Sequence, residues 1–245
     1  MSDPQFLHAA REKDYGCSPV GVEAANRTGK GVFKNSPVRL FLIFSLVLCL
    51  CGPAGAQQIT EQGRMLIQLL DSTQVEQLWL PHRKVLWRTG QPTGEPVNDM
   101  KPHSHCSAFV AAAAERLGIY ILRPPEHSTV RLANAQADWL AGQGKDNGWQ
   151  AVPTPEEAQR SANSGMLVVA VYKETYPGRS GHIAIVRPSL KTLRLIQEVG
   201  PQITQAGLEN HASTSLKEGF KHHKRAWKDR KVRFYSHVVN WKVQF

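Results

Sequence analysis

Apolar residues recur every three or four positions between residues 57 and 80, as Leu66, Leu69 and Leu70 illustrate. This spacing predicts a helix, which we expect to be interrupted near Asp71-Ser72. Residues 88–102 are rich in glycine and proline, which predicts a loop. The region after residue 56 therefore begins as helix followed by loop.

A second helix is predicted over Cys106–Leu117, with Gly118 placed to end it. Its alanine-rich sequence leaves no polar stripe, and a helix without a polar face is usually buried. We therefore expect a central helix with a cysteine at its start. Two further helices are predicted, a weaker one over Val130–Leu140 and one that begins with Thr154 as N-cap and Pro155 in the first turn.

Valine and isoleucine dominate several short segments in the second half of the chain. Met166–Tyr172 and His182–Arg187 predict strands, and so do Ile203–Ala206 and Val232–Val239. Residues 189–199 fit either a short helix capped by a serine or another strand. A helix-rich half followed by a strand-rich half predicts the α+β class, with helices packed on one side of an antiparallel sheet.

The N-terminal segment has the features of an export signal. Leu40–Cys51 is an apolar run of 12 residues, which is short for a membrane span of about 20 residues. Lys34 and Arg39 precede it, and Ala54-Gly55-Ala56 follows it. These features describe a secretory signal peptide; a retained N-terminal anchor is the alternative.

Cleavage after Ala56 would divide the chain into two parts. Residues 1–56 would be an N-terminal extension plus signal peptide, and residues 57–245 a single domain. We expect the domain to be exported, either periplasmic or secreted, with membrane contact only through the signal peptide.

The chain is basic, with 30 lysines and arginines against 20 acidic residues. The first 56 residues hold 6 basic and 4 acidic residues, which leaves a net charge of +8 for the rest. Anionic envelope polymers are thus possible partners, whereas no stacking motif or zinc-finger spacing indicates nucleic acid. The basic run 217–242 fits a solvated face or a polyanion-binding patch, and His222-His223 within it is expected to be a solvated loop pair.

One cysteine remains after the predicted cleavage, because Cys17, Cys49 and Cys51 all lie in the segment removed. An unpaired cysteine in an exported protein suggests an intermolecular bridge or a reactive thiol. Cys106 lies at a helix N-terminus, where free N–H groups lower a thiol pKa. We therefore favour a reactive thiol over a buried structural cysteine.

A catalytic thiol is usually activated by an imidazole, and His182 is the best candidate because it opens a predicted strand. Cysteine first and histidine later is the order found in papain-like enzymes. His103 and His105 could instead form a zinc or copper site with Cys106. Three ligands so close in sequence rarely complete a tetrahedral site, so we expect no metal or other cofactor.

Three strings of residues together resemble the NlpC/P60 and CHAP superfamily of cell-wall peptidases and amidases. They are Ser104–Val110, Ser164–Val169 and Ser180–Val186, and the resemblance covers roughly residues 98–210. It implies a papain-like core in which a central helix carrying the cysteine packs on an antiparallel sheet. It also implies cleavage of amide bonds in peptidoglycan peptides. Met166 departs from the pattern, which has Asp there, and we expect this to affect the turn more than the chemistry.

The resemblance further implies a third residue, a polar side chain on the strand after the histidine that orients the imidazole. Glu198 fits if a tight hairpin follows His182, and Gln205 fits if a helix intervenes. A neutral amide can accept the imidazole N–H without adding charge. We favour Gln205, with Asn210 supporting the same region.

The expected protein is an exported cysteine hydrolase in which Cys106 attacks, His182 acts as base and Gln205 or Glu198 holds the ring. Its substrate would be peptidoglycan or a muropeptide. An endopeptidase and an N-acetylmuramoyl-L-alanine amidase would share this reaction centre. The alternative is a non-catalytic envelope- or peptidoglycan-binding module with a basic face.

Overall fold

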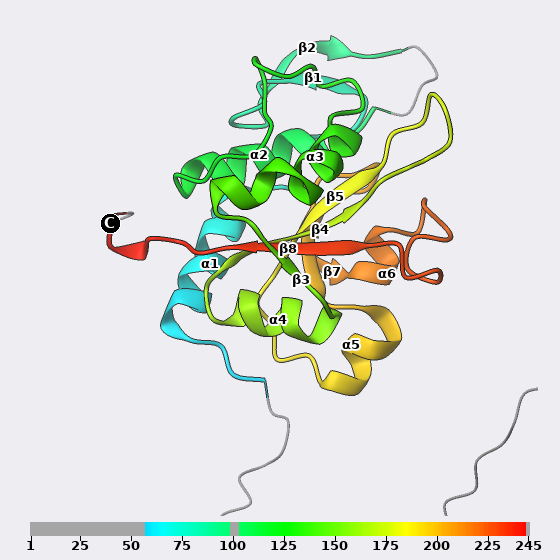
Figure 1. Ribbon diagram of the computed structural model, residues 1–245. Coiled ribbons are helices and arrows are strands. Elements are labelled where there is room, and N and C mark those ends of the chain that lie inside the picture. Colours follow the sequence, from blue (N-terminus) through cyan, green and yellow to red (C-terminus); the bar gives the residue numbers. More distant parts are fainter. Residues whose placement is uncertain (1–56, 99–102, 244–245) are drawn as a thin grey trace, which may run out of the picture. The chain divides into compact units, whose positions relative to one another are not determined.

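A computed structural model describes residues 57–98 and 103–243 of the chain (Figure 1). The predicted signal peptide and its cleavage site lie outside these residues. Within them, no helix has the length and apolar character needed to cross a membrane. The helices are α1 (Glu61–Ser72), α2 (Cys106–Arg116), α3 (Leu132–Ala141), α4 (Pro155–Asn163), α5 (Leu193–Val199) and α6 (Leu216–Gly219), with 3-10 turns η1 (Gln143–Asn147) and η2 (Trp241–Val243). The strands are β1 (Arg83–Val85), β2 (Pro92–Pro96), β3 (Gln150–Val152), β4 (Leu167–Tyr172), β5 (His182–Val186), β6 (Gln202–Gln205), β7 (His211–Ser215) and β8 (Arg233–His237).

Six of the strands form one antiparallel sheet in the order β3-β8-β4-β5-β6-β7, and β1 pairs with β2 in a separate hairpin. The central hairpin β4–β5 pairs Val169 with Ile185 and Tyr172 with His182. The predicted α+β class with an antiparallel sheet is confirmed.

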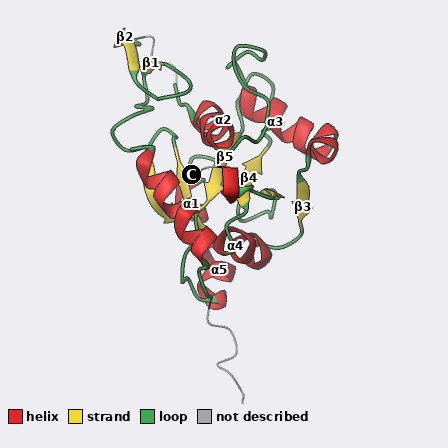
Figure 2. Ribbon diagram, turned by 90° about the vertical axis from the view of Figure 1, so that its left-hand side faces the viewer, coloured by secondary structure: helices red, strands yellow, loops and turns green. Residues whose placement is uncertain are grey.

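Helices cover both faces of this sheet, so the prediction that they pack on one side is wrong (Figures 1 and 2). Val171 and Ile183 point into a core shared with α2 and α3. Ala170 and Ala184, on the opposite face, belong to a core shared with α4 and α6. Every residue of β4 and β5 is buried, because a strand that is apolar on both faces needs cover on both.

Helix α2 is central, as its composition predicts. Residues 106–114 are all buried, and the helix packs mainly against β5. The Phe109 ring meets the Trp79 ring edge-on with 5.3 Å between centroids. Trp139 and Trp149 are also buried and belong to the core on the same side of the sheet.

Most of the predicted elements appear, but the strands β1, β2, β3 and β7 are not among the predicted ones. Residues 193–199 form a helix, and Thr192, not Ser189, caps it by accepting a hydrogen bond from the Leu195 N–H. Strand β2 lies inside the predicted loop and is exposed throughout. Strand β7 is mostly polar and pairs only with β6 at the sheet edge. Neither strand carries the alternation of apolar residues that marks a strand in sequence.

Candidate functional site

The Cys106 thiol lies at the first residue of α2 and is only 5% exposed. Burial raises its pKa, although hydrogen bonds from the backbone of Ile183, Ser107 and Cys106 itself and from the Ser104 side chain act in the opposite direction. The amide donors of the helix start thus act as predicted, but desolvation outweighs them. The net effect is a raised pKa, the opposite of the direction that the helix start alone would give.

The contact with Ile183 places the thiol at the start of β5. The β5–β6 pairs are Val186 with Ile203 and Ile185 with Thr204. Ile183 therefore lies beyond the paired part of these two strands, where its backbone can bond to a side chain of α2. Cys106 and His182 are 76 positions apart in the chain, yet the backbone group that the thiol contacts belongs to Ile183, the residue directly after His182.

The His182 imidazole is 5% exposed and bonds through Nε2 to Oε1 of Gln205 at 2.8 Å. The Gln205 amide is oriented by its other end, because its Nε2 donates to the backbone oxygen of Glu209 at 3.0 Å. Its Oε1 must then accept, so His182 carries its proton on Nε2. The remaining ring nitrogen, Nδ1, keeps a lone pair that can accept a proton.

Two rings enclose the His182 imidazole. Phe220 meets it edge-on at 4.7 Å between centroids, and His223 stacks on it at 5.8 Å with 21° between the planes. Burial lowers the pKa of His182 to about 4, with the Gln205 bond acting in the opposite direction. Burial likewise lowers the pKa of His223 to about 4, and the nearby His182 adds to this. His223 is half-buried, so its assignment to a solvated loop pair is wrong.

An asparagine of α3 holds the turn that precedes His182. Oδ1 of Asn134 accepts the backbone N–H of Gly181 at 2.9 Å and that of Glu174 at 3.0 Å. Its Nδ2 donates to the backbone oxygen of Arg179 at 3.2 Å. The β4–β5 connection is therefore bonded to a helix about 45 residues away in sequence, a role that no local motif indicates.

The thiol and the imidazole face different cores. Cys106 belongs to the core on the α2 side of the sheet. His182 is paired with Tyr172, which belongs to the core on the α4 side, and contacts Phe220 of the same core. Within residues 57–98 and 103–243, no direct hydrogen bond joins the thiol to the imidazole. The structure brings the two residues to one end of β5 without joining their side chains.

The two candidates for the third residue differ clearly in position. Gln205 is buried at the end of β6 against His182, whereas Glu198 is exposed on α5. Asn210 donates to the backbone oxygens of Val75, Leu78 and Trp79 at 2.7 to 3.1 Å and so fixes the β6–β7 turn next to Gln205. The geometry thus brings Gln205 to the imidazole and leaves Glu198 away from it.

The alternative metal site finds no support in the part of the chain that the structure describes. No group of three or more His, Cys, Asp or Glu residues there is arranged to hold a metal ion. The Nε2 atom of His105 is bonded to the backbone oxygen of Arg83 at 2.8 Å, and burial lowers the pKa of this imidazole.

Comparison with known proteins adds no family to this description. No family model matches the chain, and no curated protein sequence matches it.

Proposed function

We propose that this chain is a papain-like cysteine hydrolase that cleaves amide bonds in peptidoglycan peptides. The observation that supports it most is the His182–Gln205 bond of 2.8 Å, next to the backbone of Ile183 that the Cys106 thiol contacts. A nucleophile, a base and a group that orients the base are the parts such a reaction needs. The substrate class rests on the resemblance of the three sequence strings and on the basic charge.

In the proposed reaction, Nδ1 of His182 takes the thiol proton while the Cys106 sulfur attacks the amide carbonyl carbon. The tetrahedral intermediate collapses to a thioester, and the imidazolium gives its proton to the departing amine nitrogen. Water, deprotonated by the same imidazole, then attacks the thioester and releases the acid and the free thiol. Gln205 keeps Nε2 protonated throughout, so that Nδ1 stays the basic nitrogen.

Both groups are neutral in the resting protein, because burial raises the pKa of Cys106 and lowers that of His182. Proton transfer must therefore accompany substrate binding, with the imidazole moving toward the thiol. Catalytic hydrogen bonds are often long or misaligned before substrate binds and shorten in the complex. An endopeptidase and an N-acetylmuramoyl-L-alanine amidase would use the same steps.

The test is release of soluble muropeptides from purified sacculi, measured by mass spectrometry, for wild type and matched variants. Wild type should release fragments and Cys106→Ala should release none. Gln205→Ala should lower the rate about tenfold, the value of one hydrogen bond, and Glu198→Gln should match wild type. Equal release by Cys106→Ala and wild type would show that Cys106 is not the nucleophile.

A non-catalytic peptidoglycan-binding module is the second candidate. The observations that favour it are the 5% exposure of Cys106 and the missing bond between thiol and imidazole among the described residues. It predicts that wild type and Cys106→Ala both sediment with sacculi while neither releases fragments.

A further inference from the structure

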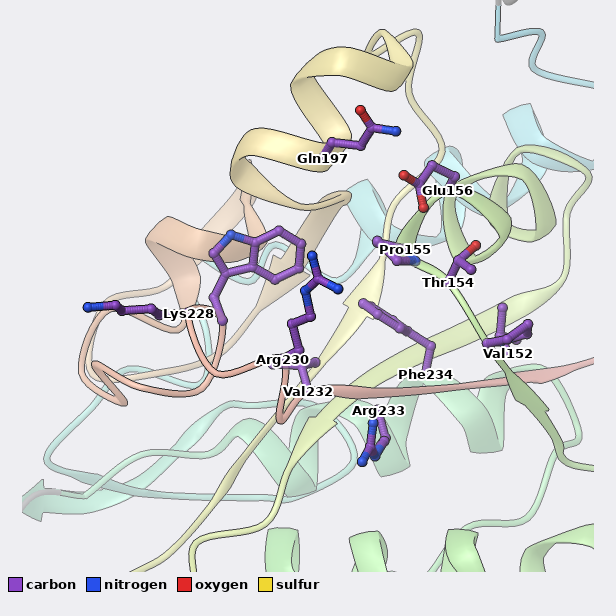
Figure 3. Close-up of a pocket in the computed structure, with 12 residues that line it drawn as sticks. Val152, Thr154, Pro155, Glu156, Gln197, Lys228, Arg230, Val232, Arg233 and Phe234 are labelled. Carbon is purple, nitrogen blue, oxygen red and sulfur yellow. The ribbon is translucent and has the colours of Figure 1, made fainter. Parts of the chain in front are cut away.

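A pocket of about 720 Å³ opens on a part of the molecule that the proposed reaction does not use (Figure 3). Its walls come from the start of α4, from α5, and from the segment that leads into β8. Neither Cys106, His182 nor Gln205 lines it. Its ligand must therefore be inferred from its own side chains.

Positive charge predominates in the pocket lining. Lys228, Arg230 and Arg233 contribute cations, and Glu156 contributes the one carboxylate among the lining residues. Figure 3 shows Arg230 extending toward the start of α4, whereas Lys228 and Arg233 point away from the centre. Within the described chain, no ion pair or side-chain hydrogen bond engages these three cations. Arg225, on the same segment, is instead bonded to Asp229 at 2.8 Å, so Arg230 is the cation left to meet an anion.

A fixed aromatic ring accompanies this cation. Trp227 lines the pocket and is partly buried. Its indole N–H donates to the backbone oxygen of Glu198 at 3.3 Å. Gly200 packs beneath the ring, since a Cβ there would lie 3.4 Å from an indole carbon. The indole is thus held in place before any ligand arrives, which reduces the entropy lost on binding.

Polar groups on the opposite wall complete the pocket. Gln197 and Glu156 reach into this region from α5 and α4 (Figure 3), and the structure gives neither side chain a hydrogen-bond partner within the described residues. A carboxylate and an amide can accept hydrogen bonds from hydroxyl groups. The carboxylate also disfavours a second anionic group on that side.

We propose that this pocket binds an anionic saccharide. Its phosphate or carboxylate would pair with Arg230, since guanidinium groups match the geometry of both anions. The C–H face of the sugar ring would lie on Trp227, and its hydroxyls would donate to Glu156 and Gln197. This inference is independent of the proposed hydrolase activity, because the pocket shares no residue with that site.

The test is an NMR titration of the ¹⁵N-labelled full chain, following the indole N–H signal of Trp227 as identified with Trp227→Phe. The probes are glucose 6-phosphate, glucuronate, glucose and inorganic phosphate, each added separately. Glucose 6-phosphate or glucuronate should shift the signal saturably, with a Kd about tenfold below those of glucose and phosphate. The anionic sugar with the lower Kd shows whether the pocket prefers a phosphate or a carboxylate.

Arg230→Gln should weaken that binding roughly 10- to 100-fold, the value of a charge-assisted hydrogen bond. Arg225→Gln is the matched control and should bind as wild type does, because Arg225 is already paired outside the pocket. The proposal is overturned if neither anionic sugar gives a saturable shift. It is also overturned if inorganic phosphate binds as tightly as the sugar phosphate, or if Arg225→Gln weakens binding as much as Arg230→Gln.

Discussion

Acidification should destabilise this protein through His182, and the size of the effect follows from the burial of its ring. The imidazole is 5% exposed, and its pKa falls from an ordinary 6.5 to about 4 in the folded state. In the unfolded chain the ring is hydrated and takes up a proton near pH 6.5. Between these two pH values the unfolded state therefore binds more protons than the folded state.

The unfolding free energy must then decrease as the pH falls. Above pH 6.5 the ring is neutral in both states and contributes no pH dependence. From pH 6.5 to 4 the stability decreases by about 1.4 kcal/mol per pH unit, which amounts to about 3 kcal/mol in total. Below pH 4 the ring is protonated in both states and its contribution levels off.

The contribution of His182 to the pH dependence of the unfolding free energy can be measured by urea denaturation of wild type and His182→Gln. Unfolding is followed by tryptophan fluorescence at pH 7, 6, 5 and 4.5. The variant should lose about 2 to 3 kcal/mol less than wild type between pH 7 and 4.5. His223 remains in both proteins, but its pKa should lie closer to the ordinary value in the variant, because the neighbouring His182 that helps to lower it is gone. Lys217→Gln, an exposed substitution, should follow wild type. Parallel curves for wild type and His182→Gln would refute the argument that burial keeps the ring neutral.

Two further predictions concern the same end of β5. Gly181→Ala should lower the unfolding free energy by about 1–3 kcal/mol. The added methyl group would overlap the Tyr172 carbonyl oxygen and lie 2.6 Å from Oδ1 of Asn134. An unchanged Tm would contradict this prediction. Resting Cys106 should react with iodoacetamide at pH 7 more slowly than the same residue in urea-unfolded protein, because burial raises its pKa and shields the sulfur. Peptide mass spectrometry measures the two rates, and faster labelling of the folded protein would contradict it.

Local sequence signals predict the parts of this fold that depend on local physics. Thr154 caps α4 by accepting the Glu157 N–H at 3.1 Å, as its place before a proline indicates. The apolar composition of α2 correctly predicts a buried helix with Cys106 at its start. The valine-rich segments correctly predict β4 and β5. In each case neighbouring residues decide the outcome.

Features that depend on distant packing are the ones that the sequence does not reveal. His223 is an ordinary loop residue by sequence, and only the chain path after α6 stacks it on His182. Asn134 is one polar residue in a weakly predicted helix, yet it accepts two backbone N–H groups of the β4–β5 connection. Whether Glu198 or Gln205 lies beside His182 likewise depends on the structure of residues 193–199. Because they form a helix, the strand that pairs with β5 is the one that contains Gln205.

Cys106 shows why a position at a helix N-terminus does not by itself predict a lowered thiol pKa. The N-terminal amides of α2 do stabilise the thiolate, but this effect falls off within one turn and is small at an exposed site. The same apolar composition that makes α2 central also removes water from the sulfur, and the loss of hydration disfavours the charged form more strongly. His182 is buried at the neighbouring strand start and loses its charge for the same reason. A nucleophile on this helix would therefore have to be activated by a substrate that brings the imidazole to it, and not by the helix dipole alone.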